Sequence, residues 1–196
     1  GKCAAWLDVP LQDGKEKYLK PGYERRAEAI AIAKEVKRIA DSCGPTLSIG
    51  IISFYRAQCD LILEALVDQG LAEEEDGEIR IARSYRQPES GDERLRVGTV
   101  DAFQGKEFDV VFLSIVRAND VVVSDQKEGD ERERLLNGKY GHLRLANRLN
   151  VAMSRQRKLL VAVGDQRMAE GPESEEGVPA LTAFLKLCRE EMAHGR

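Results

Sequence analysis

The segment 97–107, with the sequence VGTVDAFQGKE, carries residue types that could hold a nucleotide or a strand of nucleic acid. A hydroxyl such as that of Thr99, or a backbone N–H, can position a phosphate without reading base sequence. Gly105 permits close approach of the backbone to a ligand, and the Glu107 carboxylate can accept two hydrogens from a ribose. The apolar run 110–116 follows, so the segment is predicted to be a loop that leads into a buried strand. The alternative is an ordinary capped turn.

A second segment, 148–158 with the sequence RLNVAMSRQRK, places arginines at the end of a helical pattern that precedes the apolar run 159–163. Arg148 and Arg155 are seven residues apart, which is about two helical turns, so on one helix they would project from nearly the same face. A rigid guanidinium in such a place could stabilise charge on a transferring phosphoryl group. The competing interpretation is a solvated basic face.

Bulk composition limits the classes of protein that need to be considered. The chain has 196 residues, of which 42% are hydrophobic and 33% charged, and this favours one compact domain over residues 1–196. No apolar run approaches the roughly 20 residues of a membrane helix, and no signal peptide is evident. We therefore expect a soluble intracellular protein with no membrane partner, either cytoplasmic or, in a eukaryote, nuclear.

Cysteine, histidine and net charge narrow the chemistry further. Four cysteines without a Cys-x-x-Cys pair, with only His142 and His194 to assist them, predict neither a zinc site nor a disulfide framework. They also leave little for a Ser-His or Cys-His catalytic pair. The net charge of -4 argues against a broad phosphate-binding surface. It leaves room for a narrow channel, because many acidic residues cluster in 73–76 and 128–133, which we expect to be solvated loops.

Apolar strands alternate with amphipathic helices along the chain, which predicts an α/β fold with a mostly parallel sheet. Strands are expected near 4–9, 46–52, 78–82, 95–100, 109–116 and 159–163, and helices near 28–42, 56–69, 143–155 and 178–192. Ligands in such folds lie at the carboxyl ends of strands, and we expect both segments described above to lie there. Residues 119–141 are polar without apolar periodicity, so they are predicted to be a flexible insertion.

Together, the two segments resemble motifs V and VI of superfamily 1 helicases. The resemblance implies a RecA-like three-layer domain in which Arg155, after the string NVAMS, is an arginine finger that reaches the γ-phosphate of ATP. It places Gly105 and Glu107 on the nucleotide side. On the nucleic-acid side it places Thr99, Val100, Asp101 and Arg148. Arg117 and Asn119, after the next strand, also fit the family, although no role for them follows from chemistry.

Two further segments are similar to that family. The sequence YERRAEA at 23–29 resembles a segment in which an arginine followed by Glu-Ala contacts the same phosphate, so Arg26 is a second catalytic candidate. Where the family commonly has Ser and Asn, this chain has Gly22 and Arg25, and an ordinary helix start is the alternative.

The sequence IGIISFYRAQ at 49–58 resembles motif IV, which implies that Tyr55 and Gln58 lie near the nucleotide. The alternative for Tyr55 is packing at a helix start. The alternative for Gln58 is a solvent-facing helix position.

The chain lacks a Gly-x-x-x-x-Gly-Lys-[Ser/Thr] phosphate loop and a magnesium-binding acidic pair after an apolar strand. Helicases of this family carry both in a preceding RecA-like domain, so the resemblance is to the second, carboxy-terminal domain alone. It implies ATP and Mg²⁺ as ligands shared with that first domain, single-stranded DNA or RNA as a partner, and no activity for the isolated domain. The subgroup that the chain resembles is that of the nonsense-mediated-decay RNA helicase and related DNA helicases.

Two other functions stay open from sequence. The first is a non-catalytic nucleic-acid- or protein-binding module derived from a helicase fold. The second is a Rossmann-type enzyme, although no Gly-x-Gly-x-x-Gly follows the first predicted strand.

Overall fold

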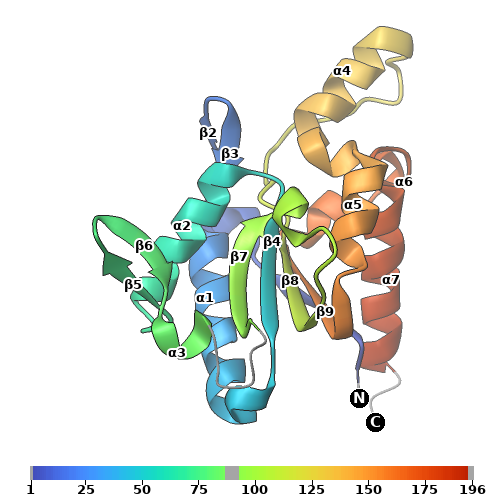
Figure 1. The fold of residues 1–196 in the computed structure, drawn as a ribbon. Coiled ribbons are helices and arrows are strands. Elements are labelled where there is room, and N and C mark those ends of the chain that lie inside the picture. Colours follow the sequence, from blue (N-terminus) through green and yellow to red (C-terminus); the bar gives the residue numbers. More distant parts are fainter. Residues whose placement is uncertain (1, 87–92, 194–196) are drawn as a thin grey trace.

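A computed structural model describes residues 2–86 and 93–193 of the chain, and its centre is a parallel five-stranded sheet (Figure 1). The strand order is β1-β9-β8-β4-β7, and each neighbouring pair is parallel. The strands are β1 (Ala4–Asp8), β4 (Ile49–Ser53), β7 (Leu95–Thr99), β8 (Phe108–Ser114) and β9 (Gln156–Gly164). Since β4 and β8 are buried at every position, most of their side chains are apolar on both faces of the sheet.

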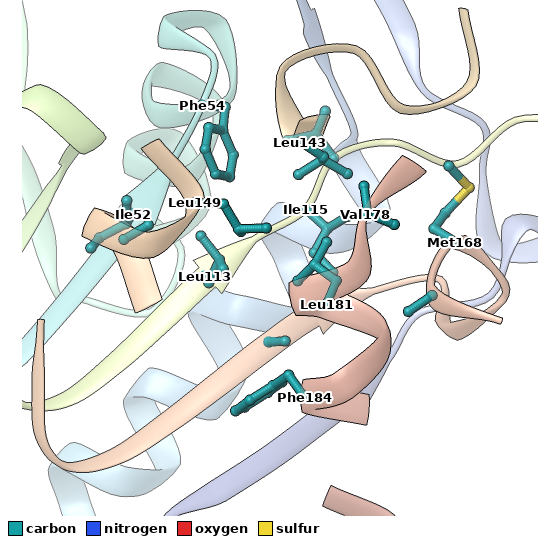
Figure 2. Close-up of a cluster of buried hydrophobic side chains, with 14 of the residues drawn as sticks. Ile52, Phe54, Leu113, Ile115, Leu143, Leu149, Met168, Val178, Leu181 and Phe184 are labelled. Carbon is teal, nitrogen blue, oxygen red and sulfur yellow. The ribbon is translucent and has the colours of Figure 1, made fainter. Parts of the chain in front are cut away.

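Helices cover both faces of this sheet and complete three layers (Figure 1). One face packs against α1 (Arg26–Cys43) and α2 (Arg56–Val67), and the other against α5 (Ala146–Met153) and α7 (Pro179–Ala193). Figure 2 shows the hydrophobic core on the side of the sheet covered by α5 and α7, where Leu113 of β8, Leu149 of α5 and Leu181 of α7 pack together. The predicted α/β, RecA-like three-layer architecture with a mostly parallel sheet is confirmed.

Smaller elements decorate this layered core. Two antiparallel hairpins are β2 (Lys17–Leu19) with β3 (Gly22–Glu24), and β5 (Ala72–Glu75) with β6 (Glu78–Ile81). Short helices are α3 (Arg83–Arg86), α4 (Gly129–Tyr140) and α6 (Pro172–Gly177). Single 3-10 turns are η1 (Leu11–Asp13), η2 (Gly44–Thr46), η3 (Val100–Phe103), η4 (Gly141–Arg144) and η5 (Gln166–Ala169). None of the helices within residues 2–86 and 93–193 has the length and apolar character needed to cross a bilayer.

Two expectations for polar stretches are corrected by the structure. The acidic residues 73–76, expected in a solvated loop, belong mostly to β5, whose partner β6 was predicted. Within 119–141, residues 129–140 form the helix α4 instead of an irregular segment. Periodicity missed α4 because only Leu136 and Tyr140 are buried along it. The mobility of 119–141 stays a prediction.

Candidate nucleotide and nucleic-acid sites

The five parallel strands begin on one side of the sheet and end on the opposite side. We call the edge at which its five strands begin the amino edge, and the edge at which they end the carboxyl edge. Since β8 has seven residues and a strand rises roughly 3.3 Å per residue, its two ends lie about 20 Å apart. The residues proposed from the sequence therefore fall into two groups, one at each end of the strands.

Arg155 lies at the amino edge, two residues after Met153 ends α5. Its carbonyl accepts a hydrogen bond of 2.9 Å from the N–H of Phe108, the first residue of β8. Its Nε donates to the Val151 carbonyl at 3.0 Å, and its Nη2 donates to the Ser154 hydroxyl at 2.9 Å. No carboxylate among the residues that the structure describes forms an ion pair with Arg155. The guanidinium is therefore held in place with its charge uncompensated.

Glu107 and Gly105 lie on the path that leads to the same edge. The Glu107 side chain is 59% exposed, with Oε2 at 3.8 Å from Nε of Arg157. Nη2 of Arg157 donates to the Glu107 carbonyl at 3.2 Å. Gly105 has a φ of +74°, a conformation that side chains rarely adopt, and it is exposed. The expectation that both motif segments lie at the carboxyl ends of strands is wrong for Arg155 and Glu107, because each directly precedes a strand.

Thr99, Val100 and Asp101 lie at the carboxyl edge, where β7 gives way to η3. Val100 as a whole residue is 2% exposed, so neither its side chain nor its backbone is open to solvent. The Asp101 carboxylate accepts a hydrogen bond of 2.6 Å from Nη2 of Arg148. Nε of Arg148 is buried and has no hydrogen-bond partner among the described residues. The structure thus brings Asp101 and Arg148 together, although they are distant in sequence.

The expected common helix face of Arg148 and Arg155 is wrong. Arg148 lies within α5, whereas Arg155 lies beyond the end of that helix. Ser154, with φ -112° and ψ 13°, leaves helical geometry between them. The two arginines therefore have different surroundings, since Arg148 pairs with Asp101 and Arg155 adjoins the start of β8.

Arg26 lies at the other edge of the sheet from Arg155. It is the exposed first residue of α1, and the Arg25 backbone next to it is tied to Gln58. Gln58 in turn donates to the hydroxyl of Ser114, the last residue of β8, at 3.2 Å. About 20 Å of strand separates this point from Arg155, so the two arginines lie at opposite ends of the strands. A contact of Arg26 with the phosphate of the nucleotide stays a prediction.

Arg25, which the sequence reasoning did not select, is a structural anchor. Its side chain is 1% exposed, its Nη2 donates to the Pro10 carbonyl at 2.7 Å, and its Nε donates to the Gly14 carbonyl at 2.8 Å. Its Nη1 lies 3.5 Å from Oε2 of Glu28. Arg25, the residue before Arg26, therefore holds the start of α1 against the loop after β1.

Gln58 is fully buried and satisfied within the protein. Its Oε1 accepts from the Arg25 N–H at 2.7 Å, and its Nε2 donates to the Arg25 carbonyl at 3.3 Å and to Ser114. The alternative of a solvent-facing position is therefore wrong. Tyr55 is 4% exposed, its ring stacks on His142 at 4.9 Å, and its hydroxyl accepts from the His142 N–H at 3.2 Å. Both side chains pack inside the carboxyl edge, as in the helix-start alternative for Tyr55.

Glu28 stabilises an unusual turn at the end of β8. Its Oε1 accepts from the Ser114 hydroxyl at 2.6 Å and from the Val116 N–H at 2.9 Å. Val116 has a φ of +66°, and the Arg117 N–H bonds the Ile115 carbonyl at 2.7 Å across it, which forms a strained γ-turn. Burial raises the pKa of Glu28 to about 7, against the hydrogen bond from Ser114 and the charge of Arg25.

The sequence also predicted the absence of a metal site. Within the described residues, no group of three or more His, Cys, Asp or Glu side chains could hold a metal ion. His194, one of the two histidines considered, lies outside them.

Comparison with known proteins places this geometry in a family. The AAA domain family model matches residues 2–167. The chain is 32% identical over 181 residues to the putative helicase MOV-10 of Gallus gallus, covering 89% of this chain and 16% of that protein. It is 32% identical over 137 residues to the DNA polymerase alpha-associated DNA helicase A of Saccharomyces cerevisiae, covering 69% and 15%. It is 31% identical over 146 residues to the regulator of nonsense transcripts 1 homolog of Neurospora crassa, covering 74% and 10%.

The chain thus spans about a sixth or less of the length of these relatives. Two of the three are named as helicases, and the residues matched by the family model contain both motif segments. The chain belongs to the AAA domain family, as a carboxy-terminal RecA-like domain of the superfamily 1 helicase type.

Proposed function

We propose that this chain is the second motor domain of an ATP-dependent superfamily 1 helicase or translocase, and that its amino edge closes onto ATP held by a first RecA-like domain. The observation that carries the proposal is the guanidinium of Arg155. It lies beside the start of β8 with no ion-pair partner among the described residues, whereas Arg148, Arg157 and Arg25 are each paired with a carboxylate.

In this proposal Arg155 is the arginine finger. Its two hydrogen bonds, to Val151 and Ser154, fix the guanidinium before the nucleotide arrives, so little reorganisation is needed when charge develops on the γ-phosphate. Such a finger contributes about 10³ to 10⁵ in turnover in related nucleotide hydrolases.

Glu107 and Gly105 complete the nucleotide side. The Glu107 carboxylate is exposed and only loosely paired with Arg157, so it is free to accept the hydroxyls of a ribose. The exposed backbone at Gly105 allows close approach of the ligand. Mg²⁺ would arrive with the phosphates, bound by the first domain.

The carboxyl edge is the proposed nucleic-acid side. Thr99 offers a hydroxyl at the end of β7, Val100 holds that end from the core, and a backbone phosphate can compete with Asp101 for Arg148. Closure of the amino edge on ATP would then alter the grip of the carboxyl edge on the strand, which couples hydrolysis to movement. For Tyr55 and Gln58 we propose positioning roles, since both side chains are buried.

The test is steady-state ATP turnover by the full-length natural protein, with and without single-stranded DNA and RNA. We expect strand-stimulated turnover that collapses in Arg155→Ala, and the polymer that stimulates more identifies the track. Arg134→Ala, an exposed arginine of α4 outside both motif segments, is the control for loss of an arginine and should keep turnover near that of the wild type. Turnover by Arg155→Ala near that of the wild type overturns the finger assignment. No turnover by the wild type instead favours the binding-module function. The isolated domain, which lacks a phosphate loop, is expected to be inactive.

A further inference from the structure

The pairing between β8 and β9 is irregular where both strands begin. Its register shifts between Phe108 and Val110. One residue of β8, Asp109, therefore lies opposite two residues of β9, Arg157 and Lys158, which is the pattern of a β-bulge. Bulges redirect side chains and occur frequently next to active sites, so the direction of these two cations calls for an explanation.

The bulge brings the two neighbouring cations of β9 to two different carboxylates. The Nζ of Lys158 lies 3.1 Å from Oδ1 of Asp109, and the Nε of Arg157 lies 3.8 Å from Oε2 of Glu107. In a regular strand, successive side chains point to opposite faces. The extra residue in β9 interrupts that alternation, so adjacent residues reach carboxylates that are two positions apart on the neighbouring segment.

Arg157 contacts both the main chain and the side chain of Glu107. Its Nη2 donates a hydrogen bond of 3.2 Å to the Glu107 carbonyl, while its Nε faces the carboxylate of the same residue. The planar guanidinium keeps its donors in a fixed geometry. One side chain therefore restrains both the backbone of Glu107 and the direction in which its carboxylate points.

Glu107 needs such a restraint because regular structure gives it little support. It lies between the turn at Gly105, whose φ is +74°, and Phe108, where β8 begins. Its side chain is 59% exposed, so core packing does not fix its rotamer. Ordering a mobile side chain during binding costs affinity, and restraining it beforehand lowers that cost. The contacts with Arg157 supply this restraint.

We propose that Arg157 is a positioning residue that makes the nucleotide site selective for ribonucleotides over 2′-deoxyribonucleotides. It holds the Glu107 carboxylate where the hydroxyls of a ribose bind, and it does not itself touch the nucleotide. Its contact with the carboxylate involves Oε2, and a carboxylate has acceptor sites on both oxygens, so ribose hydroxyls can bind while Arg157 stays in place. This inference rests on the proposed function, in which Glu107 binds the ribose.

The selectivity is measured as steady-state turnover of ATP and of 2′-deoxy-ATP by the full-length protein, with saturating single-stranded nucleic acid. The wild type is expected to favour ATP by about tenfold or more in kcat/KM, the scale of one hydrogen bond to a charged group. Arg157→Ala should raise the KM for ATP and reduce the preference to about threefold or less, because the carboxylate is no longer held. Its kcat should stay within about twofold of the wild type, since Arg155 is untouched.

Lys158→Ala is the matched control for loss of a cation from the same bulge. The Lys158 side chain is 64% exposed, and its carboxylate partner is Asp109 instead of Glu107. This variant should therefore keep the wild-type preference for ATP. Because the Arg157 side chain is also half exposed, both variants are expected to fold.

Glu107→Gln tests whether Arg157 acts through Glu107. Glutamine keeps the length of the side chain but replaces one acceptor oxygen by an amide donor. Glu107→Gln should lose the preference for ATP, and adding Arg157→Ala should change that preference no further, because both substitutions remove the same contact. Additive losses in the double variant overturn the positioning role.

The outcomes separate this inference from the proposed function. If Arg155→Ala abolishes ATP turnover while Arg157→Ala keeps the wild-type preference, the positioning inference is overturned and the motor assignment stands. Equal use of ATP and 2′-deoxy-ATP by the wild type has the same meaning. If the wild type has no turnover, the motor assignment is overturned, and calorimetric titration with the two nucleotides decides the inference. A binding preference for ATP that Arg157→Ala removes supports it, and no preference overturns it.

Discussion

Arg155 at the amino edge of the central sheet and Arg25 behind its carboxyl edge differ in burial and in pairing. At the amino edge, Arg155 has no ion-pair partner among the described residues and Glu107 is 59% exposed. Behind the carboxyl edge, Arg25 and Glu28 are fully buried and paired with each other, and Glu28 accepts a hydrogen bond from Ser114 of β8. Arg25 and Arg26 are adjacent in sequence, yet one anchors the fold and the other faces solvent. Burial and pairing, more than residue type, separate positioning residues from ligand-binding ones.

Under the proposed function, the separation of the two edges keeps the two proposed ligands apart. About 20 Å of strand separates the edges, so a nucleotide at one edge and a nucleic-acid strand at the other do not compete for the same side chains. The rigid sheet between them can transmit closure at one edge to the other. The predictions below test whether the two edges are as different as the contacts indicate.

The largest effect is expected from the paired variants Arg155→Ala and Arg148→Ala in the full-length protein. Arg155→Ala should lower strand-stimulated ATP turnover by about 10³ or more, because it removes charge from the amino edge. Arg148→Ala should keep turnover within a few-fold of the wild type at saturating strand, since Arg148 lies on the proposed nucleic-acid side. Equal losses in both variants would show that both arginines act on the nucleotide.

Glu28→Ala should destabilise the fold strongly. It leaves the Arg25 guanidinium unpaired in the interior and removes the acceptor for the Val116 N–H, for which about 3 to 5 kcal/mol is expected. Urea unfolding measures the loss. Glu35→Ala is the control, because its ion pair with Arg38 is exposed at the surface of α1 and should contribute less than about 1 kcal/mol. A cost for Glu28→Ala as small as that of the control contradicts the anchoring role.

The same carboxyl predicts a pH dependence of stability. Burial raises the pKa of Glu28 from 4.5 to about 7, so the folded state favours the protonated form. Its stabilising contribution is therefore fully present below pH 4.5 and is lost as the pH rises through 7. Relative to Glu28→Gln, the wild type should lose about 3 kcal/mol of unfolding free energy across that interval. Parallel pH profiles for the two proteins would show that Glu28 titrates normally.

Substitutions at two glycines, Gly138 within α4 and Gly177 beside it, test whether residues 119–141 are packed against the rest of the domain. A Cβ at Gly177 would overlap the Tyr140 ring, whereas a Cβ at Gly138 meets no atom within 4 Å. Gly177→Ala should therefore cost about 1 to 3 kcal/mol, and Gly138→Ala should stabilise α4 by about 0.5 to 1 kcal/mol. Thermal unfolding compares them. A neutral Gly177→Ala would indicate that Tyr140 moves freely, in agreement with the mobility predicted from the sequence.

Much of the fold could be predicted from sequence, because strands buried on both faces leave an unmistakable apolar pattern. The runs at β4 and β8 identified the sheet, and the spacing of Ile32, Val36 and Ile39 identified α1. The β2–β3 hairpin was missed since its strands have three residues each and bury none of them. Periodicity detects elements that contribute to the core, and such a hairpin does not.

The site residues could be chosen from sequence, but their distribution between the edges could not. Nothing in the sequence shows that Gln58 is fully buried against Arg25, or that Arg155 leaves the helix that carries Arg148. The general rule that ligands bind at carboxyl ends misplaced Arg155 and Glu107, because both precede strands. Those properties depend on the register of β8 and β9, which is a long-range feature.

Amide hydrogen exchange of the full-length protein, with a non-hydrolysable ATP analogue and with single-stranded nucleic acid added separately, tests the division of the two edges most directly. The analogue should protect residues 105–108 and 154–157 at the amino edge. The strand should protect residues 98–102 at the carboxyl edge. Protection of 98–102 by the nucleotide, with no change around Arg155, would contradict the account.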